Sequence, residues 1–139
     1  MKATVKWLDH MSFVGESGSG HSVVMDGAPD VGGRNMGVRP MEMVLLGLGG
    51  CTAFDIVLIL QRQRQAVSDV RVEVEAERAT EVPKVFTRIH VHYVVEGRNL
   101  DHNKVERAVT MTAEKYCSVS IMLSASVEIS HDFEIVEQE

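Results

Sequence analysis

The sequence predicts an α+β fold in which strands surround one long apolar helix. Residues 40–60 contain no Lys or Arg, and they open with Pro40, which suits the first turn of a helix. Residues 69–79 and 85–95 alternate between apolar and polar side chains, which is typical of strands with one face in the core. Residues 127–135 repeat this alternation, and residues 100–116 carry apolar side chains at helical spacing.

The predicted long helix has no polar side, so it must be buried all round. Its segment 43–60 reaches the lower length of a membrane span, which makes a span the alternative interpretation. Asp55 lies inside the segment, three glycines (Gly47, Gly49 and Gly50) crowd its first half, and no aromatic belt flanks it. We therefore predict a central core helix and no association with a membrane.

Composition predicts one soluble domain over residues 1–139. The chain has 139 residues, of which 24% are charged and 45% apolar, as in ordinary globular proteins. The first ten residues lack the apolar core of a signal peptide, so we expect a cytoplasmic location. A formal net charge of −6 argues against a nucleic-acid partner, because such a partner needs a clustered positive patch.

The two cysteines, Cys51 and Cys117, are the first candidates for chemistry. They form neither a CxxC redox motif nor a four-cysteine zinc site, and a permanent disulfide is not expected in a reducing cytosol. Two inert buried thiols are the simpler alternative. Cys117 precedes small hydroxyl residues and then apolar ones, which is typical of a helix start, where a thiolate is stabilised.

The remaining segments offer weaker candidates. Residues 1–26 read as short strands with a turn over residues 15–20, and residues 28–39 as a mobile loop that carries Arg34 and Arg39. His90 and His92 share one strand face and would suit a metal, but the sequence shows no third ligand. We therefore expect an exposed strand face there, no metal site and no cofactor.

Three segments resemble the OsmC/Ohr family of bacterial peroxide-handling proteins, in its YhfA-like branch. They are Pro40-Met-Glu42, Leu48-Gly-Gly-Cys51 and Glu114-Lys-Tyr-Cys117-Ser-Val-Ser120, and the order of elements matches over nearly the whole chain. The resemblance implies an OsmC-like α+β fold with antiparallel sheets wrapped around a long central helix. It also implies an intertwined homodimer with two active sites at its interface.

The resemblance also implies a reaction at the two cysteines. In family members that reduce organic hydroperoxides, the first cysteine attacks the peroxide and becomes a sulfenic acid, and the second then closes a disulfide on it. The matching positions are Cys51 and Cys117. A dithiol carrier, lipoamide in some relatives, reduces the disulfide.

This sequence departs from the family at the residues that activate the first thiol. The peroxidases use an arginine from the strand before the helix and a glutamate directly after the proline, where this chain has Val24 and Met41. Glu42 comes one residue late, and nine residues separate it from Cys51, which puts the two on opposite sides of an ideal helix. Arg39 and then Arg34 are the candidate substitutes for the missing cation.

We therefore assign Cys51, Cys117, Glu42 and Arg39 to catalysis, and Phe54, Asp55 and Arg34 to substrate binding. Asp55 lies one turn after Cys51 on the same helix face, and we expect it to have a hydrogen-bonding partner in this chain or a second one.

Two functions remain open: a thiol-dependent reductase of organic hydroperoxides or related electrophiles, and a non-catalytic dimer that binds a small apolar ligand, with structural cysteines. An arginine within reach of Cys51 favours the first, and an apolar lining favours the second.

Overall fold

In the computed structural model, which describes residues 1–139, the long apolar segment forms helix α1 (Pro40–Arg62). One stripe of α1 is buried, and its members recur every four residues: Leu48, Thr52, Ile56 and Leu60. Phe54, on another flank, is 70% exposed. The single chain thus buries a stripe and not the whole circumference. By length and composition α1 would also be able to span a membrane, and it is the one helix in the structure that would.

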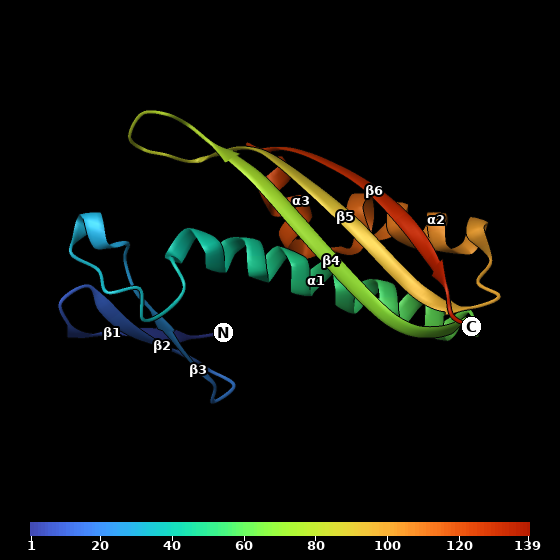
Figure 1. Ribbon diagram of the computed structural model, residues 1–139, viewed down its shortest axis with the longest axis horizontal. Coiled ribbons are helices and arrows are strands. Elements are labelled where there is room, and N and C mark those ends of the chain that lie inside the picture. The colour runs from blue at the N-terminus through green and yellow to red at the C-terminus, as the bar shows by residue number, and fades with distance from the viewer. The chain divides into compact units, whose positions relative to one another are not determined.

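Residues 1–46 form one compact unit, which contains a three-stranded antiparallel sheet. Its strands are β1 (Ala3–Asp9), β2 (Ser12–Ser17) and β3 (Ser22–Met25), as the alternation predicts (Figure 1). The turn is shorter than predicted, because Gly15 pairs within β2 opposite Val5 and Val23. A short 3₁₀ helix, η1 (Pro29–Val31), lies in the segment predicted as a loop.

A buried carboxylate organises that segment. Asp26 is 2% exposed, and it accepts hydrogen bonds from the Ser12 hydroxyl at 2.9 Å and from the backbone amides of Gly27 at 2.7 Å and Met36 at 3.1 Å. A carboxylate saturated by backbone donors fixes the chain around it. The segment before α1, which carries Arg34, is therefore tied at several points along its length.

Residues 47–139 form the second unit, around a sheet in the order β4 (Ala66–Arg78), β5 (Phe86–Arg98), β6 (Glu128–Glu137). The predicted hairpin of β4 and β5 is confirmed. β4 begins three residues earlier than the alternation indicates, since a register shift between Val67 and Asp69 interrupts the pattern. The inward residues of β5 are almost completely buried: Ile89, Val91, Tyr93 and Val95. A side chain added at Gly49 of α1 would touch Val74 of β4 at 3.6 Å, so α1 packs closely on this face.

One strand pairing differs from the expected antiparallel arrangement. β6 pairs parallel to β5, with Tyr93 opposite Phe133. The chain between them passes through α2 (His102–Met111), a π-helical turn η2 (Thr112–Tyr116) and α3 (Ser118–Ser124). Such a crossover returns the chain to the same end of the sheet, so the next strand runs in the same direction. Figure 1 shows the three strands side by side with these helices behind them.

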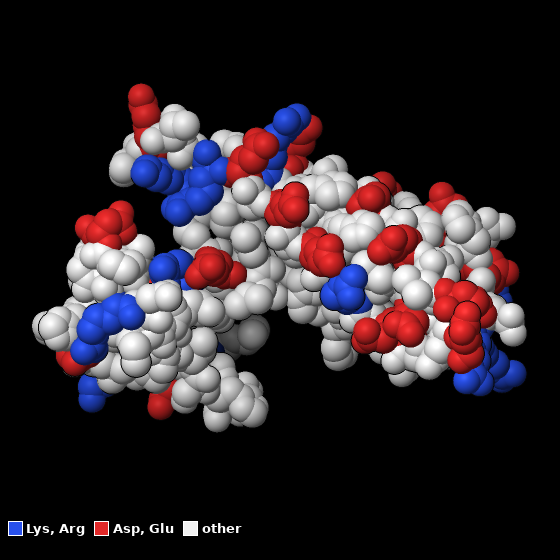
Figure 2. Space-filling model, in the orientation of Figure 1, with Lys and Arg blue, Asp and Glu red and all other residues white.

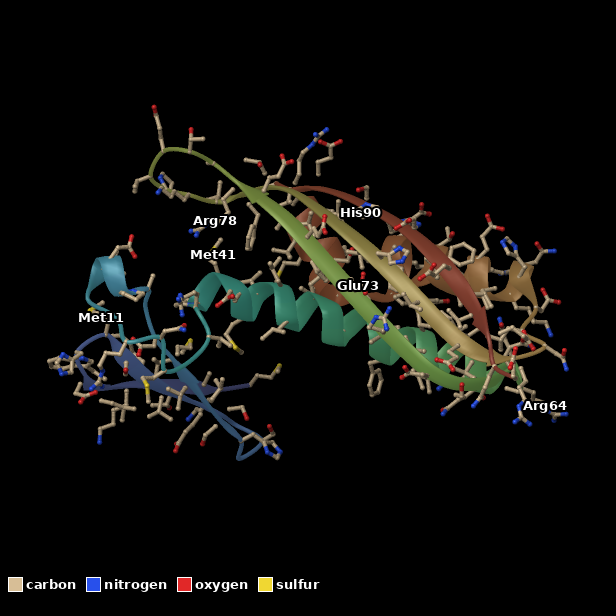
Figure 3. The ribbon with its side chains drawn as sticks, in the orientation of Figure 1. Met11, Met41, Arg64, Glu73, Arg78 and His90 are labelled. Carbon is tan, nitrogen blue, oxygen red and sulfur yellow. The ribbon has the colours of Figure 1, made fainter.

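The outer face of the second sheet is polar and acidic. Exposed carboxylates of β4 and β6 gather there, among them Glu73, Glu75 and Glu134 (Figure 2). His90 and His92 point outward from β5, as predicted, and Figure 3 labels His90 on β5 and Glu73 on β4.

The carboxylate of Asp132, on β6, lies between these two imidazoles. Its Oδ1 is 2.7 Å from Nε2 of His90 and 2.9 Å from Nδ1 of His92, and a carboxylate only accepts, so both imidazoles donate. The hydrogen bond with Asp132 raises the pKa of His92, and the same contacts, from His92 first and then His90, lower the pKa of Asp132.

These opposite shifts give the His92–Asp132 pair a pH window. A raised histidine pKa stabilises the fold below the unfolded value of about 6.5, and this contribution disappears as the pH rises through the folded value. A lowered aspartate pKa stabilises the fold above about 3.9 and loses its effect as the pH falls through the folded value. The pair therefore contributes most between these two limits.

Replacing His92 by Gln should lower the melting temperature more at about pH 6 than at about pH 8. The pair is partly exposed, so we expect a difference of about 1–3 °C between the two conditions. Thermal unfolding followed by circular dichroism measures it. His21→Gln is the control, because the His21 side chain makes no ion pair. An equal loss at both pH values for His92→Gln would contradict the pair's role.

Candidate functional site

Cys51 and Asp55 reach the site from α1, on the flank beside its buried stripe. Each directly precedes a member of that stripe, since Cys51 comes before Thr52 and Asp55 before Ile56. Residues four apart on a helix are neighbours on one face, so the thiol and the carboxylate lie one above the other. Both side chains are half-buried in the chain.

Cys117 comes from the other side of the fold, at the junction of the π-helical turn and α3. It is the N-cap of α3, and its Sγ accepts a hydrogen bond from the amide of Ser120 at 3.3 Å. Its own amide donates to the carbonyl of Thr112 at 2.9 Å. The predicted helix start at Cys117 is therefore confirmed. The π-helical turn before it was not predicted, although such turns are frequent at functional sites.

The fold brings these three side chains together. The sulfur atoms of Cys51 and Cys117 and a carboxylate oxygen of Asp55 all lie within 4.8 Å of one another. We call these three residues the thiol cluster. The two cysteines are free, and Cys117 is completely buried.

Burial controls the ionisation of Cys117 and Asp55. It raises the pKa of the Cys117 thiol to about 11, with Cys51 as a further contributor, although the hydrogen bond from the Ser120 amide works in the opposite direction. The helix start was expected to stabilise a thiolate, but the cost of burying the charge exceeds the gain from that bond. Burial also raises the pKa of the Asp55 carboxyl.

Asp55 lacks a partner within the chain. Its Oδ2 is buried without any hydrogen bond, and none of the ion pairs involves Asp55. Leaving a buried carboxylate oxygen unsatisfied is costly, so this atom requires a group that this chain does not provide. The partner expected for Asp55 is therefore not found among its own residues.

Tyr93 of β5 also belongs to this environment and was not among the predicted site residues. Tyr93 is 1% exposed, and this burial raises its pKa to about 12. The charges of the three residues in the thiol cluster raise the pKa further, whereas a hydrogen bond with Thr52 lowers it. The only sequence signal was a tyrosine among β-branched residues on the inward face of a strand.

A cavity of about 920 Å³ opens beside Asp55 within the second unit. Its apolar wall comes from Leu58, Ile59 and Met111, and its basic side chains from Arg62, Lys104 and Arg107. Neither Cys51 nor Cys117 lines this cavity, so the expectation of an arginine within reach of Cys51 stays a prediction. Phe54 lines a different cavity, of about 600 Å³, and does not join Asp55 in this one.

The other predicted site residues make their contacts within the first unit. Arg39 donates from its guanidinium to Asn35 Oδ1 at 2.7 Å and to the Gly37 carbonyl at 3.2 Å, and its backbone amide donates to Glu42 Oε1 at 2.8 Å. Glu42 thus caps the start of α1, as an acidic residue at the third helical position commonly does. Arg34 forms an ion pair with Asp9.

Comparison with known proteins places the chain in a family. The model of the OsmC-like protein family matches residues 32–132. Protein YhfA of Escherichia coli (strain K12) is 48% identical over 136 residues, which cover 98% of each chain.

Solved structures agree with this result. A hypothetical protein from Aquifex aeolicus VF5 has a TM-score of 0.86 at 26% identity and covers 99% of this chain and 97% of its own. An organic hydroperoxide resistance protein OsmC, a predicted redox protein from Legionella pneumophila, has a TM-score of 0.70 at 18% identity, over 96% and 97% of the two chains. The second likeness shows the shared fold, with its long helix and two sheets. This chain belongs to the OsmC-like family.

Proposed function

We propose that this protein is a thiol peroxidase that reduces organic hydroperoxides or related electrophiles through Cys51 and Cys117. The observation that carries the proposal is the approach of the two sulfur atoms to within 4.8 Å. These cysteines are far apart in the sequence and lie on different elements. A disulfide bond joins sulfur atoms about 2.05 Å apart, so the two sulfurs must come closer by a movement around one or both residues.

Cys51 is the thiol that attacks the peroxide in this proposal. It is half-buried, whereas Cys117 is fully buried and its pKa is about 11. At neutral pH a thiol with such a pKa is ionised in roughly one molecule in ten thousand, and the thiolate is the nucleophile. Cys117 therefore suits the second step, in which it attacks an already oxidised sulfur.

The proposed reaction has three balanced steps. The Cys51 thiolate attacks one oxygen of the O–O bond, the other oxygen leaves with a proton as an alcohol, and Cys51 becomes a sulfenic acid. Cys117 then attacks the sulfenic sulfur, water leaves and a disulfide forms. A dithiol of the lipoamide type reduces the disulfide and becomes a disulfide itself. Because this cycle needs both cysteines to return to thiols, we place it in the reducing cytoplasm.

Arg39 is the residue that we propose to favour the Cys51 thiolate. Its guanidinium contacts two neutral oxygen atoms, so no carboxylate neutralises its charge, whereas Arg34 is paired with Asp9. Glu42 contributes by holding the backbone of Arg39 at the start of α1. Asp55, Arg34 and Phe54 are proposed to contact the substrate.

We also propose a homodimer, supported by the apolar surface of the single chain. The exposed side chains include Trp7 and Leu8 of the first unit and Phe54 of α1. A side chain built at Gly47 or Gly50 would meet nothing within 4 Å, so these positions leave room for another backbone.

An apolar ligand is the second candidate function, and the cavity beside Asp55 is the observation that favours it. Its wall of Leu58, Ile59 and Met111 suits a small apolar molecule, and its volume of about 920 Å³ lies in the range of ligand sites. In this case the cysteines would be structural.

Treatment of the reduced protein with an excess of an alkyl hydroperoxide should form one Cys51–Cys117 disulfide per chain. In Cys117→Ser, the reaction should stop at a sulfenic acid on Cys51, which dimedone traps. Mass spectrometry after thiol blocking measures both products, and Cys51→Ser is the matched control that should form neither. Two thiols that stay reduced, or oxidation of Cys117 alone, would favour the apolar-ligand module.

Gly47→Arg should dissociate the dimer without unfolding the chain. The new side chain meets no atom of its own chain, so a loss of assembly reports on a second chain at this position. Sedimentation velocity at micromolar concentration should show a dimer for the wild type and a monomer for the variant. Glu75→Arg, on the exposed face of β4, is the control and should remain a dimer. A stable monomer for the wild type contradicts the proposal.

A further inference from the structure

The thiol cluster has the donor atoms of a metal site. Two thiols and one carboxylate, from α1 and from the N-cap of α3, lie within 4.8 Å of one another. Zinc binds thiolate sulfur at about 2.3 Å and carboxylate oxygen at about 2.0–2.2 Å, so the ligand atoms of a tetrahedral site are roughly 3.3–3.8 Å apart. The distances between the ligand atoms need to shorten by no more than about 1.5 Å to reach this range, which side-chain rotation can supply.

The orphaned oxygen of Asp55 leaves room for a cation at this site. Asp55 Oδ2 is buried, receives no hydrogen bond and has no Lys or Arg within ion-pair distance. Two sulfur atoms, which become anionic when they bind a metal, are its neighbours. A divalent cation among these donors would satisfy the carboxylate and compensate the negative charge of the thiolates.

The donor set selects the type of ion. Sulfur donors favour Zn²⁺ and other soft or borderline ions, whereas Mg²⁺ and Ca²⁺ prefer sites made of oxygen atoms alone. Three protein ligands leave one tetrahedral position for water or another small ligand. The cavity beside Asp55 brings solvent to the carboxylate of the cluster.

We propose that Cys51, Asp55 and Cys117 bind one Zn²⁺ ion per chain, in a tetrahedral site whose fourth ligand is exchangeable. This inference rests on the geometry and the donor chemistry of the cluster and does not depend on the peroxidase proposal. The two activities exclude each other at any moment, because a sulfur atom that holds the ion has its electron pair engaged, and a disulfide has no thiolate to offer. Zinc would thus protect the thiols from oxidants.

A second set of potential metal ligands on the chain provides the matched control. This set lies on the outer face of the second sheet and consists of His90, His92 and Asp132. The thiol cluster lies on the inner side of the same sheet. Both imidazoles already donate to the same carboxylate oxygen. Replacing the two histidines by Gln removes this set and leaves the thiol cluster intact.

Reduced, full-length protein would be titrated with Zn²⁺ in competition with a colorimetric chelator, and with Co²⁺ to record its absorption spectrum. We expect one ion per chain, with thiolate-to-cobalt charge-transfer bands and the visible bands of tetrahedral Co²⁺. Cys51→Ser and Cys117→Ser should each bind Zn²⁺ at least about 100-fold more weakly, and Asp55→Asn about 10-fold or more. The His90→Gln/His92→Gln variant should bind like the wild type. Circular dichroism of each variant verifies that it is folded.

The other outcomes overturn the proposal. Less than half an ion per chain at a micromolar excess of Zn²⁺, or binding that is lost in the double histidine variant and kept in the cysteine variants, would exclude the thiol cluster. Wild-type affinity in Asp55→Asn would remove Asp55 from the site. Peroxide oxidation of the metal-free protein is measured separately, so a failure of the peroxidase proposal and a failure of the zinc site are distinguishable.

Discussion

The packing of one stripe of α1 against the inner face of the second sheet determines the geometry of the candidate site. Leu48, Ile56 and Leu60 are completely buried, and each fully buried side chain of this size contributes about 1.5–3 kcal/mol. Because this stripe fixes the rotation of the helix about its axis, it also fixes the flank on which Cys51 and Asp55 lie. The chemistry of the site therefore depends on an apolar contact that contains none of its reactive groups.

The two cysteines differ in their burial. Cys117 receives a backbone amide at the start of α3, which favours a thiolate, yet the fully buried position raises its pKa to about 11. Removing a charge from water costs more than one hydrogen bond to sulfur returns. Cys51 is half-buried and borders Asp55. The site therefore separates a more accessible sulfur from a protected one, which suits both a two-step redox reaction and the ligation of a metal.

Two carboxylates of this chain are hydrogen-bonded by their own chain, and a third is not. Asp26 is buried but saturated by a hydroxyl and backbone amides, so it organises the segment before α1. Asp132 is exposed and held by two imidazoles on the outer sheet face. Asp55 has a buried oxygen and no partner. A carboxylate that contributes to structure is satisfied by its own chain, and the unsatisfied one lies beside the two thiols.

The sequence by itself determined the elements and their inward faces. Pro40 and the apolar run after it predicted α1, alternation predicted the hairpin of β4 and β5, and the residues after Cys117 predicted a helix start there. These signals are local, because capping and periodicity are set by neighbours a few positions apart. Tertiary structure alone decided the parallel pairing of β6, the place of Asp132 between two histidines and the approach of Asp55 to Cys117. Each joins residues more than 35 positions apart, and such contacts follow from how the helices pack on the sheet, which no local pattern encodes.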